Sequence, residues 1–261
     1  MKKTLIALAV AASAAVSGSA MAWTANGTGG TSVDLGGTLT PQAKVTPWEV
    51  QVGAAVTNLD GQIQKGLRTA SVDVKKGVFV LGIRTQKASA ILGSEYAGNI
   101  PQISYGGKLN LDSFNNGVGT VTLDALNKAN SQKIGSVKVP LLVGGVTSWS
   151  GKNGNYQKFL VANAAGQVFF GGLPKSASGA RDHVEGDLAK VSSEFGAHYV
   201  TQGGRWESMG AMTYSGADYR YNGYYGSVIE AGAKIQINLE APAAADAIAW
   251  KASLPITVSY Q

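Results

Sequence analysis

Few residues in this chain have the types and spacing that enzyme chemistry needs. The sequence contains no cysteine and two histidines, His183 and His198. A serine hydrolase would have to use one of these histidines, but no G-x-S-x-G sequence presents a serine. Asp182 directly precedes His183, a position typical of a helix cap. Two lone histidines and scattered carboxylates also lack metal-ligand spacing. We therefore expect that the protein is not an enzyme and needs no metal or cofactor.

A second group of residues has the chemistry of carbohydrate recognition. Sugar sites combine an aromatic ring, which stacks on the C–H face of the sugar, with planar polar groups for its hydroxyls. The candidate glycan-binding residues, which we expect in a Gly-rich loop, are Trp149, Asn153, Asn155 and Tyr156. A structural role explains these four equally well. The aromatic run from Tyr214 to Tyr225 is better explained as one hairpin whose tyrosines alternate between core and surface. Arg205 and Trp206 are better explained as the start of a strand.

The elements that must position any site begin with the end of the chain. Every second side chain there is apolar: Ile248, Trp250, Ala252, Leu254, Ile256, Val258 and Tyr260. This period of two predicts a long strand with one dry face. Strands usually run about five to six residues, so chance is a poor explanation. A long terminal strand of this kind can offer its edge to another protein.

The start of the chain carries an export signal. Lys2 and Lys3 precede a short apolar stretch, and Ala20-Met21-Ala22 is a small-x-small cleavage site. This pattern predicts a secretory signal peptide over residues 1–22. After it, residues 31–40 read TSVDLGGTLT and alternate again, which indicates a strand.

Composition limits the class of protein. The formal net charge of +6 is a weak excess without a basic cluster, so we expect no nucleic-acid partner. The length suits one domain of the larger all-β kind. Further strands are expected over 48–54, 70–75, 78–84, 101–105, 107–111, 118–123, 134–143 and 166–173, and residues 228–240 alternate again. Many short strands with Gly-rich turns predict a sandwich or barrel. Residues 182–195 have helical spacing, which predicts one helix inserted in the β domain, capped by Asp182.

At this point the chain resembles the FaeG-type fimbrial subunits of the chaperone–usher pathway, from fimbriae of enterotoxigenic bacteria. The resemblance spans nearly the whole chain and rests on the order and spacing of several short pieces. These are MKKTLIALAV, SVDLGGTLT, Trp48-Glu49-Val50, Ile100-Pro101-Gln102-Ile103, the run Lys133–Val139, Phe169-Phe170-Gly171-Gly172-Leu173, and the C-terminal strand with Tyr260.

The resemblance implies a fold and a mechanism of assembly. It implies an all-β, incomplete immunoglobulin-like sandwich, residues 41–261, that is completed by donor-strand exchange. Residues 23–40 would be the N-terminal donor-strand extension, with Val33, Leu35, Gly37 and Leu39 entering the groove of a neighbour. The acceptor edge would be Trp250, Leu254, Ile256, Val258 and Tyr260. Periodicity alone also allows residues 31–40 to pair within their own domain.

The resemblance also implies partners and a location. Expected partners are a periplasmic chaperone, an outer-membrane usher, neighbouring fimbrial subunits and a host glycoprotein or glycolipid. The chain would be exported through the periplasm to the cell surface, in fimbriae. The family's adhesive subunits carry an aromatic residue and an arginine before the strand that resembles Val168–Leu173. Val161 and Gly166 occupy these positions here, so this subunit either binds a different receptor or is a minor or structural relative that binds none.

The alternative is an outer-membrane β-barrel protein. An export signal, the lack of cysteine, many tyrosines and repeated alternation all agree with one. The predicted helix has no natural place in a small barrel wall, and the chain ends in Gln261 rather than in an aromatic residue. A fimbrial subunit is therefore the favoured interpretation.

Overall fold

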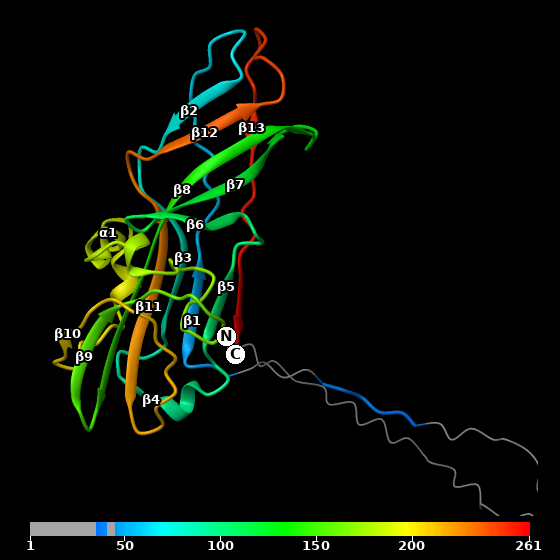
Figure 1. Cartoon of the computed structure of the whole chain (residues 1–261). Helices are drawn as coiled ribbons and strands as arrows, with labels where there is room; N and C mark the ends of the chain where they lie inside the picture. Colours follow the sequence, from blue (N-terminus) through cyan, green and yellow to red (C-terminus); the bar gives the residue numbers. More distant parts are fainter. Residues whose placement is uncertain (1–34, 41–44) are drawn as a thin grey trace, which may run out of the picture. The chain divides into compact units, whose positions relative to one another are not determined.

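The structure, a computed structural model, describes residues 35–40 and 45–261 (Figure 1). The chain divides into two units, Met1–Ala43 and Lys44–Gln261. In the first unit, residues 35–40 form neither helix nor strand, so the strand expected over 31–40 is absent from this part of it. The predicted signal peptide over residues 1–22 and the donor residue Val33 lie outside the described residues.

The second unit is built almost entirely of strands. They are β1 (Trp48–Val52), β2 (Thr69–Asp73), β3 (Val78–Thr85), β4 (Ile91–Leu92), β5 (Pro101–Ser104), β6 (Leu109–Asn115), β7 (Val118–Asn127), β8 (Lys133–Gly151), β9 (Gly154–Phe159), β10 (Arg205–Trp206), β11 (Arg220–Ile229), β12 (Lys234–Leu239), β13 (Trp250–Lys251) and β14 (Thr257–Tyr260). The helical elements are α1 (Val184–Val191) and the short 3₁₀ turns η1 (Gly93–Tyr96), η2 (Ala177–Gly179) and η3 (Ser193–Gly196). No helix among the described residues is long and apolar enough to cross a membrane.

Strand β8 joins two groups of strands in the main sheet. It is 19 residues long; its first half pairs with β7 and β12, and its second half pairs with β9 and β11. In Figure 1 this strand runs from the part of the domain around β12 to the part around β9. The main path of strands is β1-β3-β11-β8-β12-β2, and β5 pairs separately with β14. This arrangement is an all-β, immunoglobulin-like fold, as the resemblance to FaeG-type subunits implied.

The helix covers the outer face of β8 and β11. Val184 and Leu188 of α1 pack with Phe195, Tyr224 and Val228 in a small second core. The sequence predicted a helix here, but α1 begins at Val184 and the cap differs. His183 is the residue before the helix, in a left-handed conformation with φ 52°, and no side chain caps the helix. The expected capping role of Asp182 is therefore wrong.

Two stretches that were expected to be strands contain turns instead of one continuous strand. The stretch 166–173 is not a strand, because Gly166, Phe169 and Gly171 all have left-handed φ angles of 83°, 62° and 84°. A side chain on Gly171 would place its Cβ atom 2.0 Å from the Ile103 carbonyl oxygen, so this turn packs tightly on β5. Residues 228–240 likewise form the end of β11 and then β12, separated by a turn at Gly232 with φ 82°.

Candidate site: an open apolar groove

The C-terminal segment keeps its dry face but not a continuous strand. From Trp250 to Tyr260 every second residue is partly buried against the core, and the residues between them are exposed or nearly so. Only β13 and β14 are strands, because β13 pairs with β7 and β14 pairs with β5. Residues 252–256, which include Pro255, lie between these two pairings and belong to no strand. The long strand predicted from Ile248 to Tyr260 is therefore broken, although its alternation of exposure is confirmed.

A large apolar groove lies beside this segment. It has a volume of about 1120 Å³, and its two walls are residues 52–63 and 244–256. Figure 1 shows β1 (blue) and the C-terminal segment (red) along the same side of the domain. The floor consists of apolar side chains from β2, β7, β8 and β12, including Val72, Leu123, Val139, Ile235 and Ile237. A groove of this volume that is lined mainly by apolar side chains is typical of a binding site.

The predicted acceptor residues divide into two groups. Trp250, Leu254 and Ile256 line the groove. Val258 and Tyr260 lie outside it, in β14, where they pack against the main core. Of the predicted acceptor edge, Trp250, Leu254 and Ile256 thus lie together in the groove, and Val258 and Tyr260 do not.

Strand β1 shows most directly that the sandwich is open here. Val50 pairs with Ile83 and Val52 pairs with Leu81, so each pair shares one face of the sheet. Ile83 and Leu81 are 1% and 0% exposed, whereas Val50 and Val52 are 40% and 57% exposed. Trp48 on the same face of β1 is only 3% exposed. The inner face of β1 is therefore closed at its start and open at its end.

Both walls also leave backbone without a sheet partner. The pairing of β1 with β3 ends where the Gly53 amide donates to the Val80 carbonyl oxygen at 2.9 Å. Residues 54–61 belong to no strand, as do residues 252–256 across the groove. An extended peptide placed between two such segments could hydrogen-bond to both. Sequence analysis identified β1 as a strand but missed its role in the groove, because exposure of its inner face depends on what is absent beside it.

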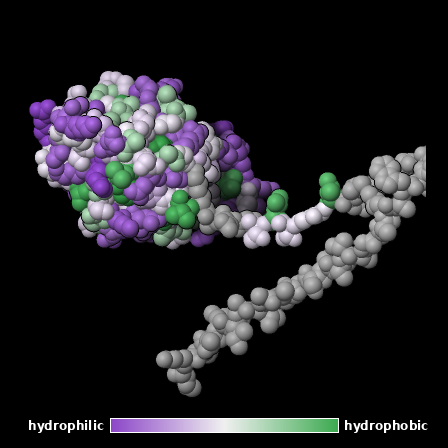
Figure 2. Space-filling model, turned by 90° about the horizontal axis from the view of Figure 1, so that it is seen from below, coloured by the Kyte–Doolittle hydropathy of each residue, from purple (hydrophilic) through white to green (hydrophobic). Residues whose placement is uncertain are grey.

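The predicted donor residues are nearly fully exposed. Leu35 and Leu39 are 93% and 96% exposed, and a Cβ atom at Gly37 would meet no atom within 4 Å. Exposed leucines in an extended segment are unfavourable in water, and covering each contributes roughly 1.5–3 kcal/mol. Figure 2 shows that the face of the domain seen from below is largely polar, with apolar residues in small separate spots.

The four candidate glycan-binding residues lie together in a hairpin rather than in a loop. Trp149 lies in β8, Asn155 and Tyr156 lie in β9, and Asn153 is in the turn between the strands. Tyr156 stacks on Trp149 with ring centroids 5.3 Å apart, and the Arg205 guanidinium lies 4.8 Å from the centre of the Tyr156 ring.

The polar groups of this hairpin also have protein partners. The Tyr156 hydroxyl donates to the Asn153 carbonyl oxygen at 2.5 Å, and the Asn155 amide donates to the Gln202 carbonyl oxygen at 2.7 Å. Trp149 is only 9% exposed. The glycan-binding role of these residues stays a prediction.

The tyrosines of β11 do not alternate between core and surface. Tyr221, Tyr224 and Tyr225 are all buried, because the main core covers one face of β11 and α1 with η3 covers the other. Burial raises the pKa of Tyr221, whose hydroxyl accepts a hydrogen bond from the Gly216 amide. These residues are therefore part of the core.

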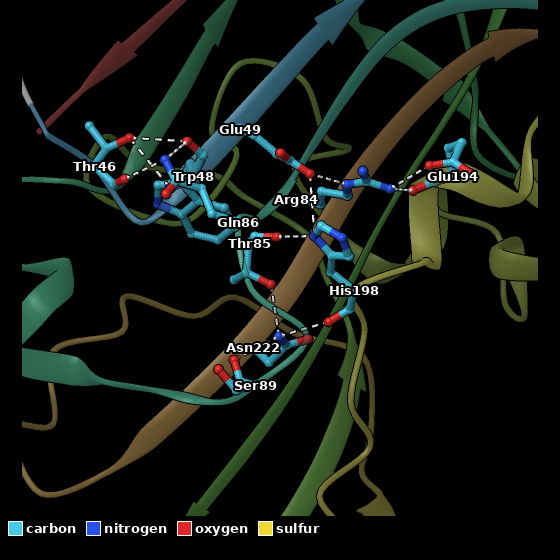
Figure 3. A network of polar contacts seen from close by, with 10 residues as sticks. All are labelled: Thr46, Trp48, Glu49, Arg84, Thr85, Gln86, Ser89, Glu194, His198 and Asn222. Carbon is cyan, nitrogen blue, oxygen red and sulfur yellow. Dashed lines mark hydrogen bonds and ion pairs between the residues drawn. The ribbon is translucent and has the colours of Figure 1, made fainter.

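The two histidines have structural partners. His183 is 73% exposed, with its Nδ1 atom 3.5 Å from Glu185. The Nδ1 atom of His198 lies 2.8 Å from the Thr85 carbonyl oxygen and 3.3 Å from Glu49 (Figure 3). No group of three or more histidine, aspartate or glutamate side chains in the described part of the chain could hold a metal ion.

The polar network in Figure 3 fixes β1 to the rest of the domain. Arg84 forms ion pairs with Glu49 of β1 and Glu194 of η3. Burial alone would lower the pKa of Arg84, but the hydrogen bonds to both carboxylates raise it above its ordinary value. Asn222, which is fully buried, donates to Thr85 Oγ1 at 2.8 Å and to the His198 carbonyl oxygen at 3.1 Å. This network holds the start of β1 in place, and β1 leads into one wall of the groove at Val52.

Comparison with known proteins defines the class. The whole chain, residues 1–261, matches the family described as fimbrial, major and minor subunit. The chain therefore belongs to this family, and it is a structural subunit of a surface fimbria that polymerises with other subunits and is not an enzyme. Family membership confirms the resemblance to FaeG-type subunits. It supports a fimbrial subunit over the alternative of an outer-membrane protein.

Individual relatives come from Escherichia coli. The chain is 36% identical to K88 fimbrial protein AB over 197 residues, which cover 69% of this chain and 67% of that protein. It is 34% identical to K88 fimbrial protein AD over 217 residues, covering 73% of this chain and 74% of the relative. It is 28% identical to F41 fimbrial protein over 285 aligned positions that cover 100% of both chains.

Proposed function

We propose that this fimbrial subunit polymerises by donor-strand complementation. Residues 31–40 of one subunit would enter the groove of the next as an extended strand. Val33, Leu35 and Leu39 would be its apolar contacts, and Gly37 would lie where the groove is shallow. The observation that carries this proposal is the groove itself, with exposed Val52 on one side and half-buried Trp250, Leu254 and Ile256 on the other.

The energetics support a strand as the ligand. Three buried aliphatic side chains contribute about 5–9 kcal/mol before any backbone hydrogen bond forms. This is comparable to the whole stability of a typical domain, about 5–15 kcal/mol. Backbone hydrogen bonds to residues 54–61 and 252–256 would add to it, and alternate side chains would give specificity. The isolated subunit would accordingly be marginally stable or prone to aggregate.

An open groove of this kind also explains the other proposed partners. Exposed strand edges and apolar surface favour aggregation, so the subunit needs cover before it is assembled. A periplasmic chaperone would supply a temporary strand, and an outer-membrane usher would be the place where the neighbour's strand replaces it. The signal peptide over residues 1–22 would direct the chain to this route.

The test compares thermal unfolding of three forms of the mature chain, all lacking residues 23–40. The first carries nothing further, and the second carries TSVDLGGTLT after Gln261 through a flexible linker. The third is a matched control in which both leucines of the added peptide are replaced by aspartate. We expect the second form to be monomeric and to melt tens of degrees above the other two. Equal melting of all three would show that the groove does not take this strand.

A further inference from the structure

The end of the domain beyond the groove carries an exposed leucine on a fixed loop. Leu67 precedes β2 and is 46% exposed. Its carbonyl oxygen accepts a hydrogen bond from the Ala243 amide at 2.8 Å, and the Gly66 amide donates to the Ala243 carbonyl oxygen at 2.9 Å. In Figure 1 the loops before β2 (cyan) and after β12 (orange to red) lie together at the end of the domain opposite the C-terminus. We call residues 64–67 and 240–245 the apex.

The apex continues the apolar lining of the groove to the outside. Its exposed residues after β12 include Ala241, Pro242, Ala244 and Ala245. Ala244 and Ala245 also line the groove, whereas Leu67 lies just outside it. Because Ala243 is 4% exposed and joins the two loops, the apex is a packed part of the domain. It therefore presents Leu67 in a defined position beside one end of the groove.

The opposite end of the domain, which we call the base, carries an exposed valine. Val45 is 89% exposed, and the chain directly after it is anchored to the domain. The Gln86 amide donates to the Pro47 carbonyl oxygen at 2.9 Å, and Trp48 Nε1 donates to the Asn99 carbonyl oxygen at 2.8 Å. Val45 is thus an apolar side chain held at the point where the N-terminal extension meets the domain.

The groove and the length of the extension bring these two ends together in a polymer. Trp48, Val258 and Tyr260 do not line the groove, and they are buried or half-buried at the base. The groove is therefore closed towards the base, and a strand held in it leaves at the apex. Val45 follows the last donor leucine, Leu39, by six residues, which span at most about 22 Å. The base of a subunit is accordingly tethered beside the apex of the subunit that holds its extension.

We infer that Val45 of each subunit packs on Leu67 of the neighbouring subunit whose groove holds its extension. The partner is a second copy of this chain, and the contact rests on the proposed strand exchange. It lies outside the groove, because neither residue lines it. The short tether keeps the two surfaces at a high effective concentration, so even a small contact forms. Its role is to fix the angle between successive subunits, which a strand on an extended linker does not fix.

The first test is cross-linking in assembled fimbriae of the full chain. The sequence contains no cysteine, so two introduced cysteines are the only thiols. Disulfides form only when the Cα atoms lie about 4.4–6.8 Å apart. We expect Val45→Cys/Leu67→Cys fimbriae, after mild oxidation, to give a ladder of multimers that survives boiling in detergent and collapses with reductant. The control pair is Val45→Cys/Lys152→Cys, with Lys152 in the exposed turn between β8 and β9, and it should give no ladder.

A charge exchange tests the same contact without cysteines. Val45→Glu and Leu67→Lys should each speed dissociation of neighbouring subunits about tenfold, because each places one charge against an apolar partner. The double variant should return to within about threefold of wild type, because the two charges then meet. Both positions are exposed in the free subunit, so none of these changes should alter its own unfolding.

The outcomes separate this contact from strand exchange. The melting comparison of the three truncated forms contains no neighbouring subunit and tests the groove alone. If the added strand stabilises the domain there, but Val45→Cys/Leu67→Cys gives no ladder or the control pair gives an equal one, the contact is wrong and strand exchange stands. If the cysteines prevent assembly, the charge exchange decides, and a double variant that dissociates about a hundredfold faster than wild type overturns the contact.

Discussion

Replacing Leu35 with alanine should weaken the fimbria without weakening the subunit. In the subunit alone Leu35 is 93% exposed, so Leu35→Ala should change its stability by no more than about 0.5 kcal/mol. In the polymer, the leucine would be buried in the groove of a neighbour. Losing about three buried carbon groups at roughly 0.8 kcal/mol each would cost each contact about 2.4 kcal/mol.

This cost can be converted into a rate. Effects of interface substitutions appear mostly in dissociation, and about 1.4 kcal/mol corresponds to a tenfold change. Leu35→Ala should therefore speed dissociation of neighbouring subunits by roughly 50-fold. Thr38→Ala is the matched control, because in an extended strand Thr38 points to the opposite face from its neighbours Gly37 and Leu39.

The assay has two parts. Heating fimbriae in detergent and resolving the remaining multimers on a gel gives the temperature at which subunits separate. Denaturant unfolding of the isolated subunit gives its own stability. We expect Leu35→Ala fimbriae to dissociate at a clearly lower temperature than Thr38→Ala fimbriae, with similar unfolding of the two free subunits. If the two variants dissociate alike, or if Leu35→Ala destabilises the free subunit by a similar amount, the reasoning is refuted.

Three further predictions concern the folded domain, measured on the strand-complemented form. Asn222→Ala should lower the free energy of unfolding by about 1–3 kcal/mol, because Thr85 and other buried groups lose their hydrogen-bond partner. Denaturant unfolding measures this loss, with Asn163→Ala, at an exposed position, as the control. Hydrogen bonds from Lys190 and then Arg181 lower the pKa of Asp187 in the folded protein. The Asp187 carboxylate therefore stabilises the fold above about pH 4, and this stabilisation is lost as the pH falls through the pKa of the folded state. Asp187→Asn should be less stable than wild type at pH 7, and an equal difference in unfolding free energy at pH 2 would contradict this. Burial raises the pKa of Tyr105 to about 12, and seven of the ten tyrosines have raised pKa values. The free energy of unfolding should therefore fall as the pH rises above about 10, because these tyrosines ionise more readily in the unfolded chain. An absorbance titration should show fewer than half of the tyrosines ionising near pH 10.

Local patterns in the sequence predicted the elements with a simple period. The alternation from Trp250 to Tyr260 gave the correct dry face, and the helical spacing within 182–195 gave α1. Both signals are local, because a period of two or of 3.6 places side chains on one face whatever lies opposite. The same signal failed at 166–173, where left-handed residues turn the chain, since conformation at Phe169 is imposed by packing and not by its own type.

The sequence by itself determined the class of fold, the lack of catalytic machinery and the apolar faces that strands would bury. Only the tertiary structure decided which of those faces remain uncovered. Val50 and Ile83 are both apolar strand residues, yet one is 40% exposed and the other 1%, because exposure depends on which strands lie alongside. Trp149 and Trp206 likewise differ, at 9% and 45% exposed, although both lie in strands. Periodicity specifies a face, whereas a groove or an exposed ring is made by segments that are distant in the chain and meet only on folding.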